Sequence, residues 1–261
     1  MIKNKLLILL TLLVVSFHSI AQDWAQLFDY PKYQNVKISP DGKHLAVAMD
    51  MDGKRALAFL ERATMKYVGG AKLPGINEVG RFYWANNERV VVKVYQREPW
   101  RKTPAYYGEL FAVNLDGSSG EMIYGYRSFD KQSATSGGSK FKKKKQIRGW
   151  ADIIDMLPED DKHILISSTP WDIEGDRLAS VYKLNIYNGK VKQKRIGGSP
   201  IPYAKFLTDH ESNIKLVGGT DKSYTGKVFV RENKKWQQLP ESEVGENFYP
   251  CLLYTSPSPR D

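Results

Sequence analysis

Four histidines and three groups of carboxylates are the side chains of this sequence best suited to acid–base chemistry or metal binding. His18 lies in an apolar N-terminal segment, and His210 lies in the polar stretch Thr208–Ser212. His44 and His163 occupy equivalent places in a repeated unit, each just after a turn. Repeated positions of this kind indicate turn structure, so we expect neither residue to be a ligand or a catalyst.

The carboxylates gather at Glu159–Asp161, Asp172–Asp176 and Glu241–Glu246. The first group stands where a hairpin turn is expected, which favours a structural role. Asp172-Ile-Glu-Gly-Asp176 offers oxygen atoms of the kind that bind a cation, but it matches no complete calcium-loop pattern. We therefore assign no metal site.

The familiar catalytic motifs are absent from these 261 residues. There is no Gly-x-Ser-x-Gly elbow, no Gly-x-Gly-x-x-Gly phosphate loop and no His-Glu-x-x-His pair. The only cysteine is Cys251, so no disulfide framework is possible within one chain. No catalytic residue and no cofactor is predicted.

The chain is basic, with a formal net charge of +10. Half of this excess comes from the five lysines of Lys140–Lys145, in the Ser/Gly-rich stretch Ser128–Gln146. A basic cluster can bind nucleic acid or acidic lipid, but this one has no interleaved aromatic residues and no helical face. We predict a solvated surface loop and no nucleic-acid partner.

The N-terminus has the pattern of a signal peptide over residues 1–21. Lys3 and Lys5 precede the apolar run Leu6–Val15, and Ser19–Ala21 is a small-x-small cleavage site. The run is about half the ~20 residues that a membrane-spanning helix needs, which disfavours the alternative of a membrane anchor. The predicted protein is cleaved near Ala21, exported to the periplasm or medium, and has no stable membrane anchor.

Residues 251–261 break the patterns that precede them. Pro257 and Pro259 are incompatible with a central strand, and the segment resembles a translated sequencing-adapter read-through. We interpret it as a non-native tail, with a genuine disordered tail as the alternative.

The hairpin Val36–Ala48 is the element around which the rest is organised. Apolar and polar residues alternate on both sides of Ser39-Pro-Asp-Gly42, a sequence suited to a tight turn. Similar strands recur in four groups, with predicted strands near residues 36–68; 81–85, 89–95, 109–115 and 121–124; 147–156, 163–167, 180–186 and 190–196; and 203–207, 213–217, 226–231 and 235–239.

Four strands per unit, repeated about every 40–50 residues, are typical of β-propeller blades. A β-sandwich is the alternative, because its short strands have similar spacing. The pattern stops at Phe248–Pro250, so we predict an all-β fold, a partial β-propeller of about four four-stranded blades over residues 22–250. The inserted loop Gln96–Gly108 is aromatic and basic, and two interpretations stay open: a binding loop, or a tip folded onto its own blade.

The hairpin Ile38–Ala46 resembles the first propeller blade of the prolyl oligopeptidase family of serine peptidases. Lys54–Ala58, Phe82–Val90 and Ile147–Asp155 add to this resemblance, which extends from Gln22 to about Pro250. Exported bacterial dipeptidyl- and acylaminoacyl-peptidase-like members fit best. The Ser-Pro-Asp-Gly element alone is also shared with TolB-type propellers.

The resemblance implies a two-domain enzyme in which the propeller gates access of short peptides to an α/β-hydrolase domain. The nucleophile, oxyanion hole and their partners would all lie in that second domain. The expected role is therefore substrate gating, with short peptides as partners and no hydrolase activity in the 261 residues alone. The alternative is a stand-alone periplasmic binding module, TolB-like, for a protein or glycan partner.

Overall fold

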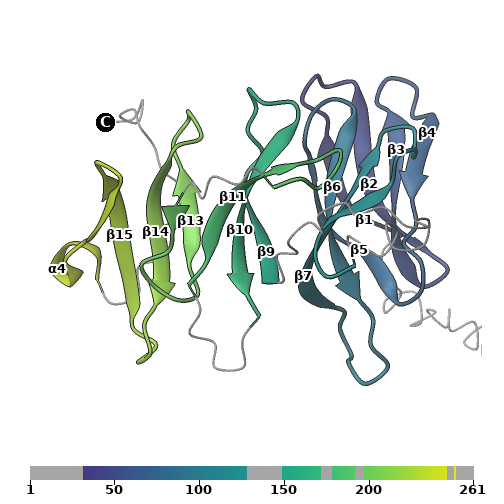
Figure 1. The fold of residues 1–261 in the computed structure, drawn as a ribbon. Coiled ribbons are helices and arrows are strands. Elements are labelled where there is room, and N and C mark those ends of the chain that lie inside the picture. Colours follow the sequence, from purple (N-terminus) through teal and green to yellow (C-terminus); the bar gives the residue numbers. More distant parts are fainter. Residues whose placement is uncertain (1–31, 128–148, 172–177, 192–196, 246–249, 251–261) are drawn as a thin grey trace, which may run out of the picture. The chain divides into compact units, whose positions relative to one another are not determined.

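The computed structural model describes residues 32–127, 149–171, 178–191, 197–245 and 250. The chain divides into two compact units, Met1–Lys32 and Tyr33–Asp261, and the fold described here is that of the second. Its described residues form sixteen strands and the short helix α4 (Glu241–Val244). The strands make four antiparallel sheets of four, and each sheet follows the order of the sequence (Figure 1).

The strand bounds repeat from sheet to sheet. Sheet 1 contains β1 (Tyr33–Ile38), β2 (His44–Met51), β3 (Lys54–Glu61) and β4 (Tyr67–Ala71), and sheet 2 contains β5 (Asn77–Trp84), β6 (Arg89–Gln96), β7 (Ala105–Asn114) and β8 (Glu121–Tyr124). Sheet 3 contains β9 (Gly149–Asp155), β10 (His163–Pro170), β11 (Ser180–Asn185) and β12 (Gly197–Gly198), and sheet 4 contains β13 (Lys205–Thr208), β14 (Ile214–Thr220), β15 (Gly226–Glu232) and β16 (Lys235–Gln238).

The turn between β1 and β2 shows why the motif folds as it does. Gly42 adopts a φ of 72°, in the left-handed region that glycine enters without strain. The Gly42 amide donates to the Ser39 carbonyl at 2.9 Å, and the Asp41 carboxylate accepts from the Lys43 amide at 3.1 Å. Asp116, Asp160 and Asp209 accept from the amide two residues onward in the same way. Of these aspartate turns, those at Asp160 and Asp209 lie between the first two strands of sheets 3 and 4, as that at Asp41 does in sheet 1, whereas that at Asp116 lies between β7 and β8 of sheet 2.

Several predicted strand bounds were wrong, and β5 begins at Asn77 rather than at Arg81. β7 begins at Ala105 rather than at Glu109, because β6 runs on to Gln96 and pairs with Ala105. The predicted last strand of sheet 3, at 190–196, is instead the short β12 at Gly197–Gly198, which pairs with Ser180 and Val181. Only Val191 of the predicted segment forms a bridge, and residues 192–196 lie outside the described part.

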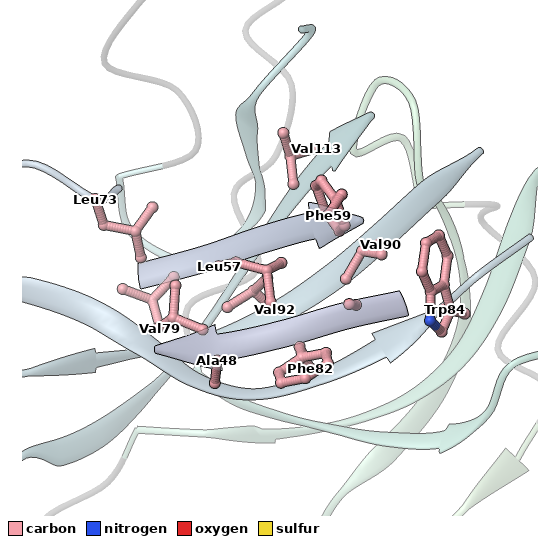
Figure 2. Close-up of a cluster of buried hydrophobic side chains, with 12 residues drawn as sticks. Ala48, Leu57, Phe59, Leu73, Val79, Phe82, Trp84, Val90, Val92 and Val113 are labelled. Atoms are coloured by element: carbon pink, nitrogen blue, oxygen red, sulfur yellow. The ribbon is translucent and has the colours of Figure 1, made fainter. Parts of the chain in front are cut away.

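Each hydrophobic core lies between two consecutive sheets. The core between sheets 1 and 2 joins Ala48, Leu57 and Phe59 to the apolar face of β5 and β6, as Figure 2 shows. A second core, including Ile164 and Ile166, joins sheets 2 and 3, and a third, including Phe206 and Val217, joins sheets 3 and 4. A middle sheet therefore buries both faces, which explains strands with few polar residues, such as β6.

Hydrogen bonds also join neighbouring sheets. The Trp84 indole N–H donates to the Lys37 carbonyl at 3.0 Å, between sheets 2 and 1. The Arg89 Nε donates to the Ile186 carbonyl at 2.8 Å, between sheets 2 and 3. The Trp236 indole N–H donates to the Gly198 carbonyl at 2.8 Å, between sheets 4 and 3.

The all-β prediction of a partial β-propeller with four four-stranded blades is confirmed. Among the described residues, strands pair only within consecutive groups of four, and no crossover of the kind found in a sandwich joins the sheets. The predicted signal peptide lies outside the described residues.

Candidate functional site

Aromatic and charged side chains gather where sheets 2 and 3 meet, at the strand ends away from the aspartate turns. This region includes the end of β6 at Gln96, the residues that follow β8, the start of β9 and the end of β10. The pairs Gln96–Ala105 and Pro170–Gly149 mark these strand ends.

A buried carboxylate in β5 links sheet 2 to sheet 1. Glu78 is only 1% exposed, and its Oε1 accepts from the Arg55 Nη2 at 3.2 Å. Its Oε2 accepts from the Arg97 Nη2 at 2.9 Å. A carboxylate so removed from water needs charged partners, so these two arginines hold the ends of β3 and β6 against β5.

A second buried carboxylate fixes the chain after β8. Glu109 is fully buried, and its Oε1 accepts from the Arg127 Nε at 3.0 Å. The Gln96 side-chain amide donates to Glu109 Oε2 at 3.2 Å, and the Arg127 Nη1 donates to Asn77 Oδ1 at 2.8 Å. We call Glu78, Glu109 and the three arginines the carboxylate–arginine network.

Next to this network lies an aromatic cluster, which consists of Tyr126, Trp150 and Trp171. The ring centroids of Tyr126 and Trp171 are 5.6 Å apart, and those of Trp150 and Trp171 are 6.0 Å apart. The three residues are 37%, 40% and 36% exposed, unlike the buried pair Phe59 and Trp84 of the first core. The cluster therefore presents aromatic surface to solvent.

The free edge of β9 faces a polar group of sheet 2. The Tyr106 hydroxyl donates to the Ala151 carbonyl, and the Lys93 ammonium pairs with the Asp152 carboxylate while lying 4.9 Å from the Tyr106 ring centroid. Burial, and then the nearby Asp152 carboxylate, raises the pKa of Tyr106 well above its usual range. The hydroxyl thus stays protonated as a donor and satisfies the strand edge.

The first strands of sheets 1 and 2 bring two cations together. The Lys37 ammonium lies 4.1 Å from the Tyr83 ring centroid, a cation–π distance. Burial lowers the pKa of Lys37, and the positive charge of Arg81 lowers it further. Neither the Lys37 and Arg81 pair nor the Lys93, Tyr106 and Asp152 group combines the nucleophile, base and orienting partner that covalent catalysis needs.

An apolar groove of about 840 Å³ lies on the face of sheet 1 that does not contact sheet 2. Val36, Leu45, Val47 and Met49 line it, and Val36 is 53% exposed. Leu45 and Val47 stand where sheet 2 has two valines, at 90 and 92, which pack against sheet 1. The open face of sheet 1 is therefore equivalent to the face of sheet 2 that packs against sheet 1.

The predicted equivalence of His44 and His163 is confirmed, since they begin β2 and β10 as Arg89 begins β6. The His163 Nδ1 lies 2.9 Å from Asp160 Oδ1, so this histidine contacts the turn that precedes β10, as predicted. The His44 Nδ1 is buried without a hydrogen-bond partner among the described residues.

Three predicted features lie outside the described residues: Lys140–Lys145, Asp172–Asp176 and His18. In the part that is described, no group of three or more His, Cys, Asp or Glu side chains could hold a metal ion. Searching the same part finds no helix with the length and apolar character of a membrane span.

The loop between β6 and β7 is shorter than predicted, and Trp100 at its tip is 77% exposed. The Trp100 side chain thus does not pack onto its own sheet, and both interpretations of the loop stay predictions. Glu98 orders the loop, because it accepts from the Tyr107 hydroxyl at 2.8 Å and pairs with the Arg101 Nε at 3.1 Å.

The carboxylate–arginine network and the aromatic cluster were not predicted. Glu78 and Glu109 lie in strands where a charge normally indicates an exposed position, and their hydrogen-bond partners are 13–23 residues distant in the sequence. Trp150 alternates with buried Gly149 and Ala151, which could have placed it on the outer face of β9.

Comparisons with known proteins identify no family for this chain. No protein-family signature matches the chain, and no curated protein matches it either. Acylaminoacyl peptidase of Pyrococcus horikoshii is 14% identical, with 80% of this chain and 32% of that chain covered and a TM-score of 0.45. The β-propeller domain of the Trilobed protease from Pyrococcus furiosus is 14% identical, with 82% and 59% covered and a TM-score of 0.43.

TolB from Acinetobacter baumannii is also 14% identical, with 79% of this chain and 42% of that chain covered and a TM-score of 0.39. The chain thus spans less than two thirds of the length of each of these three structures. Peptidase propellers and TolB both occur among them, so the similarity does not select one function.

Proposed function

We propose that the chain is the propeller part of an exported serine peptidase of the prolyl oligopeptidase type. In this role the four sheets admit and orient short peptides for a catalytic α/β-hydrolase domain that these 261 residues do not contain. The sequence resemblance of the hairpin Ile38–Ala46 and its companions supports the family. Signal-peptide cleavage near Ala21 would deliver the protein to the periplasm or the medium.

The single observation that carries this proposal is the open apolar face of sheet 1. Its groove of about 840 Å³ is lined by residues at the positions that sheet 2 buries against its neighbour. Exposed apolar surface on this scale indicates a missing partner, and the repeat indicates that the partner is another sheet of the same kind. Further blades, and with them a larger protein, supply that sheet.

Amidase activity tests the proposal. The longer gene product that includes the catalytic domain should hydrolyse p-nitroanilide peptides, and a serine-directed fluorophosphonate should abolish this activity. The 261-residue chain, assayed as the matched control, should be inactive. Fluorophosphonate-sensitive cleavage by the 261-residue chain itself, or none by the longer product, would contradict the proposal.

A further inference from the structure

We infer that the exposed aromatic residues at one end of the four sheets form the surface on which the folded domain that follows the propeller in the same polypeptide docks. This inference rests on the proposed function, because it assigns the contact surface of the catalytic domain that the proposed function requires. Three observations carry it: the alignment of the sheets, the distribution of exposed aromatic side chains and the course of the chain.

The four sheets are aligned, so each of their two ends carries one kind of connection. Hydrogen bonds of 2.9, 2.8 and 2.6 Å join consecutive sheets where their first strands end, in the pairs Asp41–Asn87, Asn86–Asp161 and Asp155–Thr208. The opposite end therefore carries the connections between second and third strands, together with the connections from sheet to sheet. We call it the loop end.

Exposed aromatic side chains are concentrated at the loop end. Outside the groove of sheet 1, the tryptophans and tyrosines of the described residues that are at least 36% exposed are Trp100, Trp150, Trp171, Tyr126, Tyr203, Tyr224 and Tyr187. Of these, only Tyr187, in the turn after β11, lies at the other end. Tryptophan and tyrosine are enriched in protein–protein interfaces and supply much of their binding energy. The asymmetry therefore indicates that the loop end is an interface.

The loops that present these side chains are ordered by their own hydrogen bonds. Beside Trp100, the Glu98 carboxylate accepts from the Tyr107 hydroxyl at 2.8 Å. The Asp221 carboxylate accepts from the amides on either side of Tyr224, at 2.9 and 3.0 Å. An ordered loop loses little conformational entropy when a partner docks, which favours association.

Another propeller blade cannot cover the tryptophans of this surface. Sheet 2, which carries Trp100, already packs against sheet 1 on one face and sheet 3 on the other. Sheet 3, which carries Trp150 and Trp171, packs against sheets 2 and 4. Only a body that lies at the loop end itself can bury these side chains.

The course of the chain brings the following domain to this end. Each sheet has four antiparallel strands in sequence order, so the chain enters and leaves every sheet at the same end. Tyr33 begins β1 and Gln238 ends β16 at the loop end. Any further four-stranded sheet preserves this arrangement, so a domain that follows the last sheet is tethered at the loop end. The tether raises the effective concentration of the domain at these aromatic residues.

Hydroxyl-radical footprinting of the longer gene product, analysed by mass spectrometry, tests this inference. Each oxidation rate is divided by that of the free amino acid, and Trp100 is compared with Tyr187. Exposure in the four sheets alone would make Trp100 the faster, because it is 77% exposed and Tyr187 is 41% exposed. We expect docking to reverse this order and to make Trp100 at least about threefold slower than Tyr187. If Trp100 reacts faster in a product that cleaves p-nitroanilide peptides, the inference is wrong and the proposed function stands.

Trp100→Glu in the longer product should loosen the interface and raise the oxidation rate of Trp171 at least about threefold. Ala63→Glu places the same charge at an exposed position of the β3–β4 turn, at the opposite end, and this matched control should leave the rate unchanged. A Trp171 rate that does not respond to Trp100→Glu would contradict a common interface. Protection of Trp100 only after addition of phosphatidylglycerol vesicles would show that the loop end binds a membrane instead. A longer product without amidase activity would remove both the proposed function and this inference.

Discussion

The Nη2 of Arg55 in β3 lies 3.2 Å from Oε1 of Glu78 in β5, so one ion pair joins sheet 1 to sheet 2. The same carboxylate also accepts from Arg97 at 2.9 Å, at the end of β6. Because Glu78 is almost completely buried while the arginines are partly exposed, the carboxylate is the member that cannot exchange its partners for water.

We predict that Glu78→Gln destabilises the fold by about 1–3 kcal/mol, since it removes the charge that both arginines share and leaves their hydrogen bonds weaker. Urea unfolding followed by circular dichroism measures this change. Asp52→Asn is the control, because Asp52 is 88% exposed and pairs with Lys72 on the surface. Asp52→Asn should have a much smaller effect than Glu78→Gln, because water screens this surface pair. Equal effects of the two substitutions would contradict the role of Glu78 in joining the sheets.

Arg89 makes a second link, between sheets 2 and 3, and it is only 1% exposed. Its guanidinium donates to the Ile186 carbonyl at 2.8 Å and to the Ser119 carbonyl at 3.1 Å. Arg89→Met should cost about 2–4 kcal/mol, because the buried Ile186 carbonyl and the partly buried Ser119 carbonyl lose their donor. Thermal melts measure the loss, and Arg62→Met on the exposed surface is the control. A melting temperature unchanged by Arg89→Met would contradict this account.

The repeated turns made most of the fold predictable from the sequence. Alternation around Ser39-Pro-Asp-Gly42 identified the first hairpin, Asp160 marked the equivalent turn of sheet 3, and Asp116 marked a later turn, between β7 and β8. β12 was misplaced because a two-residue strand has no alternation to detect. β7 was begun too late because Tyr106 and Tyr107 read as a loop, whereas the pairing of Ala105 with Gln96 makes them part of the ladder.

The candidate site was much less predictable. Glu78 and Glu109 are buried only because arginines from distant segments reach them, and no local pattern shows such partners. Trp150 and Trp171 become neighbours through the register of β9 with β10, which the strand assignment alone does not give.

Gly69 in β4 tests the contact between sheet 1 and the β7–β8 turn of sheet 2. A Cβ atom there would lie 2.4 Å from the backbone carbon of Asp116, closer than real contacts allow. Gly69→Ala should therefore cost about 1–3 kcal/mol through overpacking. Gly75→Asn, at a φ of 63° with open space around it, is the control and should be nearly neutral. Chemical denaturation of both variants measures the change in the free energy of unfolding. No change for Gly69→Ala would contradict the tight contact between Gly69 and the β7–β8 turn.

The aspartate turns predict how stability depends on pH. Burial raises the pKa of Asp160, but hydrogen bonds from His163, the Lys162 amide and Lys183 outweigh it and bring the pKa to about 2. An unfolded aspartate has a pKa of about 4. The contribution of Asp160 to stability is thus complete above about pH 4 and is lost as the pH falls from about 4 to about 2.

Asp160→Asn should consequently flatten the loss of stability in that interval, when urea midpoints are compared at pH 4.5 and pH 2.5. Asp161→Asn, the exposed neighbour, should leave the slope unchanged. Identical slopes for wild type and Asp160→Asn would show that the turn is not the source of the acid sensitivity.

The most direct test of the central claim is to read the coding DNA beyond codon 250. We predict that the reading frame continues through further four-stranded units into a domain that bears Gly-x-Ser-x-Gly, followed by an aspartate and a histidine. Another sheet from this continuation would then cover the groove at Val36 and Val47. A genuine stop codon directly after Asp261 would contradict the peptidase assignment and favour a small stand-alone binding propeller.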